Sequence, residues 1–217
     1  MIPLVEPDMT ELEADAVYQV VLSGWINEGR LSDEVSRNFA EIVGARFAVP
    51  TTSCTGAMAL SLMALGLKDR EVIIPDITMI GTAMAVVQSG NTPVVVDVRP
   101  DDSCIDPEML LKAINPRTAA VIPVHVNGRN AVGPELVKIA QDHGLEIVED
   151  AACCLGSTAE RDGGARQLGT TGIAGCFSLA ATKIVTSGQG GIIVTDDEAF
   201  YEKATRLKDW GRFEEKG

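Results

Sequence analysis

The sequence has 217 residues, of which 46% are hydrophobic and 23% charged, as in an ordinary globular protein. Asp and Glu outnumber Lys and Arg by 31 to 18, a net charge of −13 that repels nucleic-acid phosphates and acidic lipid surfaces. No apolar run approaches the ~20 residues of a membrane-spanning helix, and the acidic start is unlike an export signal. We therefore expect a cytoplasmic protein that binds neither nucleic acid nor membrane.

Short β-branched runs alternate with longer segments of helical spacing, which is typical of an α/β protein with a largely parallel sheet. In chain order we expect helices at Thr10–Leu22 and Ser32–Val43, a strand at Arg46–Thr51, a helix at Thr55–Leu65, a strand at Glu71–Pro75, a helix at Thr78–Gln88, a strand at Pro93–Val98, a helix at Pro107–Ala113, a strand at Ala119–Val124, a helix at Gly133–Asp142, strands at Leu145–Asp150, Ala174–Leu179 and Gly191–Thr195, and a helix at Asp197–Trp210. Residues 156–172, rich in Gly and Thr, are expected to form an exposed loop. The sequence thus predicts a mostly parallel seven-stranded sheet with helices on both faces.

The cysteines argue against metal and disulfide frameworks. There are five, Cys54, Cys104, Cys153, Cys154 and Cys176, an odd number without the paired spacing of zinc modules. We expect them to be reduced, mostly buried, small apolar residues. With only two histidines and no ligand spacing, the sequence predicts no metal site.

Open parallel sheets bind ligands beyond the carboxyl ends of their strands, so the residues there are the candidates for chemistry. The strand at 145–150 ends in Asp150, and the small Ala151 and Ala152 leave space beside this carboxylate for a flat ligand. A carboxylate in this place can hold a proton on a ring nitrogen. The alternative interpretation is an acid that caps a helix or tethers a loop.

Two further segments supply an amine and a phosphate cradle. Lys183 is a single amine among apolar and small residues, where desolvation favours the free amine that forms a Schiff base; the alternative is an ordinary lysine on a loop. Residues 52–57 place hydroxyls and free amides at a helix start, where a phosphate can bind, although such residues also start helices for local reasons. An acid for a ring nitrogen, an amine for an aldehyde and a phosphate cradle together meet the requirements of pyridoxal 5′-phosphate.

The same segments carry a family resemblance. The blocks SGWINEG, FAEIVGARFAV, TTSCTGAMALSLMALGL, VIIPDITMIGTAMAV, PVHVNG, IVEDAA, CFSLAATKIVTSGQGG and KDWGR resemble, in this order, those of the DegT-type (DegT/DnrJ/StrS) sugar aminotransferases. The resemblance implies the aspartate-aminotransferase fold, the cofactor pyridoxal 5′-phosphate and transfer of an amino group to a nucleotide-linked keto-deoxy-sugar. It also implies glutamate as the amino donor and a homodimer as the working assembly.

The resemblance implies roles for individual residues. Lys183 matches the Schiff-base lysine, which also moves a proton, and Asp150 matches the acid that pairs with the ring nitrogen. Residues that match contacts of the cofactor phosphate are Thr55, Gly56 and Ser178.

Substrate-binding candidates come from two places. Trp25, Ile26 and Asn27 match a segment that lies near the substrate in dimers of the family. His125, at a predicted strand end, is a candidate for orienting a substrate or cofactor group. The alternative for His125 is a neutral histidine bonded to a backbone carbonyl.

Several positions depart from the family pattern. Met79 stands where an aromatic ring usually covers the cofactor, and a methionine covers a ring face less rigidly. Cys153 stands where a glutamine usually helps to hold the cofactor, so one hydrogen bond is missing. Ala180 and Ala181 replace a frequent His-Pro, and Asn127 replaces a tyrosine. We keep Met79 and Cys153 among the predicted cofactor-binding residues.

We assign residues 1–217, including the N-terminal segment 1–30, to the cofactor-binding large domain, and we expect the family's smaller C-terminal domain to be absent. One alternative function is a catalytically inactive module that binds the cofactor or a partner. Another is a keto-cyclitol aminotransferase or a dehydratase of the same family. The dehydratases typically have histidine in place of the lysine, so Lys183 favours an aminotransferase.

Overall fold

The computed structural model describes residues 6–161 and 163–211. Residues 1–5 of the predicted N-terminal segment, residue 162 of the predicted loop and residues 212–217 of the predicted domain lie outside this description. In chain order the elements are α1 (Glu11–Ser23), α2 (Arg30–Val43), β1 (Phe47–Thr51), α3 (Cys54–Ala64), β2 (Glu71–Pro75), α4 (Ile80–Gln88), β3 (Thr92–Val96), α5 (Pro107–Ala113), β4 (Thr118–Val121), η1 (Val126–Gly128), α6 (Pro134–His143), β5 (Glu146–Asp150), β6 (Thr158–Arg161), β7 (Gly164–Gln167), β8 (Ala174–Ser178), β9 (Gly191–Thr195) and α7 (Glu198–Lys208). Every predicted helix and strand is present, with ends shifted by a few residues.

Seven of the strands form one sheet in the order β1-β9-β8-β5-β4-β2-β3. β5 pairs in parallel with β4 and β8, and β2 pairs in parallel with β4 and β3. β9 is antiparallel to both of its neighbours, β1 and β8. The mostly parallel seven-stranded sheet is therefore confirmed, and the start of β9 lies at the same edge as the carboxyl ends of the other strands.

Helices cover both faces of this sheet because successive strand residues point to opposite sides. In β9, Ile193 packs in one core cluster with residues of α3, α4 and α7, whereas Ile192 packs on the other face with Phe39 of α2. Helices α5 and α6 share this second face, where Leu110 and Leu136 belong to one cluster with strand residues of β2, β4 and β5. The predicted two-sided arrangement is thus confirmed.

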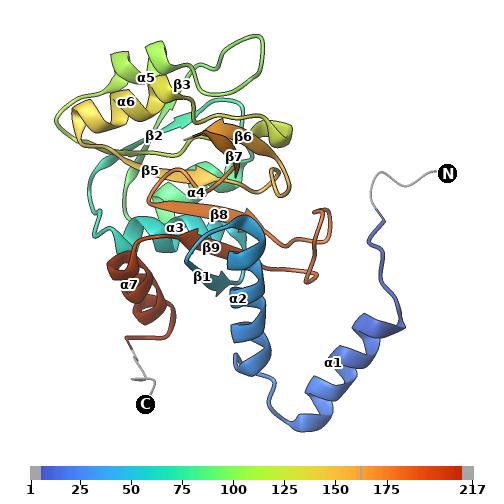
Figure 1. The fold of residues 1–217 in the computed structure, drawn as a ribbon. Helices are drawn as coiled ribbons and strands as arrows, with labels where there is room; N and C mark the ends of the chain where they lie inside the picture. The colour runs from blue at the N-terminus through green and yellow to red at the C-terminus, as the bar shows by residue number, and fades with distance from the viewer. Residues whose placement is uncertain (1–5, 162, 212–217) are drawn as a thin grey trace.

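The first helix stands apart from the core (Figure 1). α1 begins with a capping box in which Thr10 Oγ1 accepts from the Leu12 N–H, and the Glu13 carboxylate accepts from the Thr10 N–H. None of its residues is buried, and apolar side chains such as Tyr18 and Val21 are exposed. No helix in the described ranges is both long and apolar enough to cross a membrane.

The prediction of a plain exposed loop over residues 156–172 is wrong. β6 and β7 pair there as an antiparallel hairpin that forms a separate two-stranded sheet. Its Gly-rich and charged composition is rare in strands, which explains why periodicity missed it. The chain after the hairpin is not exposed either, because Leu168 is buried in the same core cluster as Phe177.

Candidate active site

Asp150 ends the central strand β5, and its carboxylate is buried. Oδ2 accepts a hydrogen bond from Thr82 Oγ1 at 2.7 Å, and Oδ1 accepts one from the Ala152 N–H at 3.1 Å. Burial raises the pKa of the Asp150 carboxyl above its ordinary value, and these hydrogen bonds offset the effect only in part. None of the ion pairs among the described residues involves this carboxylate. Asp150 is therefore a buried acid that a cation could stabilise.

Thr82 is a site residue that sequence reasoning missed. It is fully buried in α4, and its hydroxyl lies 2.6 Å from the Thr78 hydroxyl and 2.7 Å from Asp150 Oδ2. The only signal in the sequence was one polar residue inside the apolar run IGTAMAVV. A threonine whose hydroxyl bonds to a carbonyl of its own helix gives the same signal. Thr82 orients the Asp150 carboxylate from the helix side of the sheet.

The N-terminus of α3 meets the start of β9 at close range. Ser53 caps the helix, with its Oγ accepting the Gly56 N–H at 3.0 Å. A Cβ on Gly191 would lie 2.3 Å from the Ser53 carbonyl carbon, so only glycine permits this approach. Gly191 also pairs with Ser178 across the sheet. The structure thus brings Ser178 to the first turn of α3, which contains Thr55 and Gly56, at the positive end of the helix.

Lys183 lies in the loop between β8 and β9 and reaches the turn that follows β5. Its Nζ donates a hydrogen bond to Cys153 Sγ at 3.0 Å. Both residues line a cavity of about 160 Å³ with Ser178, and Ala151 and Ala152 border it as well. The positive charge of Lys183 is one of the weaker influences that lower the pKa of Asp150, so the amine is within electrostatic range of that carboxylate. The predicted amine and acid therefore share one site.

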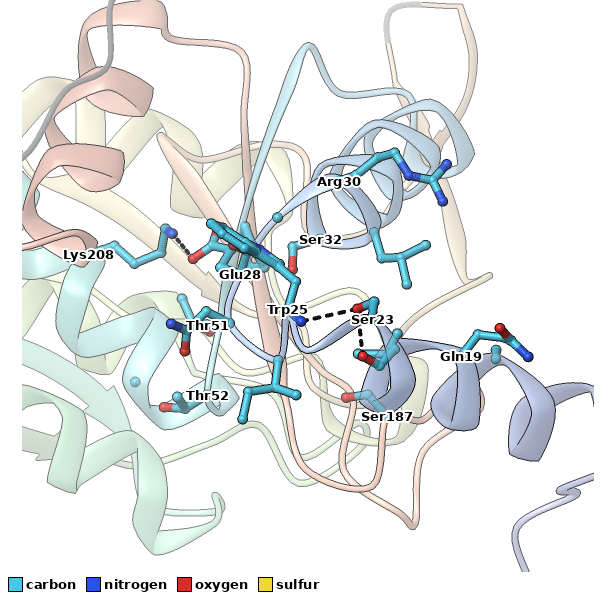
Figure 2. Close-up of a pocket in the computed structure, with 18 of the residues that line it drawn as sticks. Gln19, Ser23, Trp25, Glu28, Arg30, Ser32, Thr51, Thr52, Ser187 and Lys208 are labelled. Atoms are coloured by element: carbon cyan, nitrogen blue, oxygen red, sulfur yellow. Dashed lines mark hydrogen bonds and ion pairs between the residues drawn. The ribbon is translucent and has the colours of Figure 1, made fainter.

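A second, larger cavity of about 1270 Å³ is lined by the predicted substrate segment and by the cradle. Trp25, Ile26 and Asn27 line it together with Thr52 and Gly56. Figure 2 shows Trp25 and Thr52 among the lining residues. Trp25 and Ile26 are largely exposed. Because Gly56 belongs to the first turn of α3, the structure places the predicted substrate segment beside the predicted phosphate cradle.

One contact closes this segment into a turn, and another ties it to the body of the protein. The Trp25 indole Nε1 donates to the Glu28 carbonyl oxygen at 3.1 Å, which closes the turn. The Glu28 carboxylate forms an ion pair with Lys208 at the end of α7, beside Trp25 in Figure 2. Ser187 also lines this cavity. The loop between β8 and β9, which carries both Lys183 and Ser187, therefore borders the smaller and the larger cavity.

Met79 is the residue that precedes α4, and it is 70% exposed. A Cβ on Gly81 would lie 2.7 Å from the Met79 methyl carbon and 2.6 Å from Thr55 Oγ1. The Met79 methyl group and the Thr55 hydroxyl are therefore both drawn in over Gly81. A bulkier residue at position 81 would push one of them away.

His125 does not join these residues. Its side chain is fully buried, Nε2 donates to Glu149 Oε2 at 2.8 Å, and Nδ1 accepts from the Ala131 N–H at 3.2 Å. This pairing is that of a neutral ring protonated on Nε2. Nδ1 also lies 3.2 Å from the Arg129 carbonyl oxygen, but in this tautomer it has no hydrogen to donate, so the Glu149 carboxylate is the acceptor that holds the ring instead of the expected backbone carbonyl. With both nitrogens engaged and no exposed surface, His125 has no group left for a substrate, and we correct that prediction.

Glu149 is the partner that holds His125. Its carboxylate also accepts the backbone N–H groups of Gly169, Thr171 and Gly172 at 3.2, 2.6 and 2.7 Å. Burial alone would raise its pKa, but the His125 hydrogen bond and the amide hydrogen bonds outweigh burial, so the pKa of Glu149 lies below its ordinary value. Glu149 thus fastens the segment after the β6–β7 hairpin to the sheet.

An amine, a buried acid and a helix N-terminus gathered at the carboxyl edge of an α/β sheet are an arrangement typical of ligand sites in enzymes. Residues 7–217 match the model of the DegT/DnrJ/EryC1/StrS aminotransferase family. The chain belongs to this family.

Relatives of known structure or name agree with this assignment. The chain is 35% identical over 224 residues to the spore coat polysaccharide biosynthesis protein SpsC of Bacillus subtilis (strain 168), covering 100% of this chain and 57% of SpsC. DesI, solved in the presence of its TDP-sugar product, matches with a TM-score of 0.87 and 35% identity over 94% of this chain and 52% of DesI. GDP-4-keto-6-deoxymannose-3-dehydratase, solved with a trapped PLP-glutamate geminal diamine, matches with a TM-score of 0.87 and 28% identity over 97% of this chain and 55% of that protein. The chain spans about half the length of these relatives.

Proposed function

We propose that this chain is the cofactor-binding large domain of a pyridoxal-phosphate-dependent aminotransferase that moves an amino group from glutamate to a nucleotide-linked keto-deoxy-sugar. The observation that carries the proposal is the pairing of two groups: the Asp150 carboxylate, which is buried without an ion-pair partner among the described residues, and the Lys183 amine within electrostatic range of it. The family membership and the nucleotide-sugar product of DesI support the substrate class.

The residues present fit pyridoxal phosphate. The buried Asp150 carboxylate would gain a counter-charge from a protonated ring nitrogen, and the neighbouring Ala151 and Ala152 leave room for a flat ring. The close approach of Gly191 to Ser53 leaves the α3 N-terminus and Ser178 side by side, where they can accept a phosphate. When bound, the cofactor supplies an aldehyde that can carry an amino group and a protonated ring that withdraws electrons.

Each residue of the candidate site has its own role in this proposal. Asp150 holds the proton on the ring nitrogen, and Thr82 orients Asp150. Lys183 would hold the cofactor through Nζ, and its amine would be placed to move a proton at the substrate carbon. Thr55, Gly56 and Ser178 hold the phosphate. Met79 covers one face of the ring, and Cys153 contacts the Lys183 amine where the family has a glutamine.

The substrate segment and the assembly belong to the same proposal. Trp25, Ile26 and Asn27 line the large open cavity, which has room for a nucleotide-linked sugar. The exposed apolar residues of α1, including Tyr18 and Val21, supply a surface for a second copy in a homodimer. The free thiols of all five cysteines fit a reducing, cytoplasmic location.

The test is to titrate the purified chain with pyridoxal phosphate. We expect a long-wavelength absorption band that free cofactor lacks, and borohydride reduction should fix the cofactor to the peptide that contains Lys183. Lys183→Ala should abolish both signals, whereas Lys68→Ala, which removes a lysine that lines none of the described cavities, should keep them. An unchanged band in Lys183→Ala would contradict the assignment.

A second candidate function is cofactor binding without turnover, which is favoured by the departures from the family's cofactor contacts at Met79 and Cys153. Adding glutamate to the loaded chain separates the two. An aminotransferase converts the long-wavelength band into that of the amine form of the cofactor, and a keto sugar restores it. A binding module keeps the original band.

A further inference from the structure

Cys153 and Lys183 place a thiol and an amine in direct contact. Lys183 Nζ lies 3.0 Å from Cys153 Sγ, although the two residues are 30 positions apart in the chain. Their loops follow β5 and β8, which pair in parallel with Asp150 opposite Cys176, so both loops leave the sheet at the same edge. The sheet therefore fixes the pair, and the contact does not depend on sequence proximity.

Cys153 differs from every other cysteine of the chain. All five thiols are free, but Cys153 is exposed and the remaining four are buried. Burial raises the pKa of the Cys54, Cys104, Cys154 and Cys176 thiols, which keeps them protonated and unreactive. An oxidant that enters the Lys183 cavity therefore meets one accessible sulfur, and that sulfur already touches an amine.

We propose that Cys153 and Lys183 are an oxidative modification site, at which a peroxide joins the Cys153 sulfur to the Lys183 nitrogen. Hydrogen peroxide first oxidises the thiol to a sulfenic acid, forming an S–O bond and releasing one water. The unprotonated Lys183 amine then attacks the sulfur, the S–O bond breaks, and the hydroxyl leaves with one amine proton as a second water. The product is a sulfenamide with a direct S–N bond, in which sulfur has been oxidised by two electrons and the peroxide reduced by two.

The geometry favours the second step over further oxidation. A sulfenic acid survives only until a nucleophile or more peroxide reaches it. Here the nitrogen is already in contact with the sulfur, in a cavity of about 160 Å³. The S–N bond can therefore form without a rearrangement that first brings the two atoms together. A thiol reductant reopens the S–N bond and restores both side chains, which makes the modification reversible.

The consequence for the cofactor rests on the proposed function. A Lys183 nitrogen that is bonded to sulfur is no longer available to hold an aldehyde. The cross-link and the covalently held cofactor therefore exclude one another, and oxidation would switch off cofactor capture until a thiol reverses it.

The experiment treats the cofactor-free chain with dilute hydrogen peroxide and maps its peptides by mass spectrometry. We expect the peptides of Cys153 and Lys183 to appear joined, at the sum of their masses less two hydrogen atoms, and to separate again after reduction with a thiol. Cys153→Ser and Lys183→Arg should each lose the joined peptide, whereas Cys104→Ala, which removes a buried thiol that does not line the Lys183 cavity, should retain it. Because this readout uses no cofactor, it stands whether or not the aminotransferase proposal holds.

A second measurement needs no substitution. Loading with pyridoxal phosphate before peroxide should protect the pair, and peroxide before loading should reduce cofactor capture in proportion to the joined fraction. Cys153 oxidised to its sulfinic acid beside an unmodified Lys183 peptide would overturn the proposal. A joined peptide that persists in Lys183→Arg would overturn it as well.

Discussion

Glu149 and Asp150 are adjacent at the end of β5 and both are buried, yet their pKa values are displaced in opposite directions. Alternation along the strand sends the two side chains to different surroundings. Glu149 accepts from His125 and three backbone N–H groups, whose combined effect outweighs burial, whereas for Asp150 burial prevails over the Thr82 and Ala152 hydrogen bonds. The surroundings of Glu149 stabilise its ionised form, whereas those of Asp150 favour the protonated form.

The first prediction concerns Glu149 and acid stability. Because its folded pKa lies below the ordinary value of 4.5, the ionised carboxylate stabilises the fold fully above that pH. This contribution is lost as the pH falls through the lower folded pKa. Glu149→Gln should cost about 3 kcal/mol of unfolding free energy at neutral pH, since it leaves buried partners poorly matched. Urea unfolding from pH 7 to pH 3 should show a shallower acid slope in Glu149→Gln than in the wild type.

The second prediction is the opposite behaviour of Asp150. Its folded pKa lies above the ordinary value of 3.8, so the folded state holds the proton more tightly and stability falls as the pH rises through the folded pKa. In the cofactor-free chain, Asp150→Asn should therefore be at least as stable as the wild type at neutral pH. The same variant should lose cofactor capture. Thermal unfolding with and without pyridoxal phosphate measures both effects, and a large loss of stability without cofactor would contradict the description of Asp150 as a buried acid whose charge the fold does not stabilise.

The third prediction tests Thr82 as the residue that orients Asp150. Thr82→Val preserves shape but removes the hydroxyl that donates to Oδ2 at 2.7 Å. A hydrogen bond to a charged group contributes about 2 kcal/mol, so cofactor affinity should fall roughly 30-fold at neutral pH. The matched control is Thr78→Val, which removes only the outer hydroxyl of the pair and should weaken binding far less. Equal effects of the two substitutions would show that Thr82 has no special role.

The fourth prediction concerns the cradle. A Cβ at Gly191 would collide with the backbone of Ser53 and Cys54, which cannot move without breaking the helix start. Gly191→Ala should therefore cost about 3 kcal/mol in unfolding free energy and weaken phosphate and cofactor binding together. Gly133→Ala is the control, because a Cβ there meets no atom within 4 Å and its φ of −81° suits any residue. Denaturant unfolding and titration with inorganic phosphate would show whether the loss is confined to Gly191.

The sequence alone determined the order of helices and strands, the sheet that they form and the types of chemical group at its edge. Those features follow from local hydrophobic periodicity, from cap and turn residues, and from motifs that keep their order in the family. The β6–β7 hairpin was not predicted because its strands are short, exposed and rich in residues that are uncommon in strands. Local patterns therefore predicted a framework and its candidate ligands.

Only the tertiary structure decided which partners each acid, base and thiol has. His125 and Glu149 are 24 positions apart, Thr82 and Asp150 are 68, and Cys153 and Lys183 are 30. Burial and hydrogen bonding at each of these groups depend on side chains that the folded sheet brings in from elsewhere, and no periodicity in the sequence records them. That is why His125 looked like a substrate ligand, why Thr82 went unnoticed, and why the contact between Cys153 and Lys183 became visible only in three dimensions.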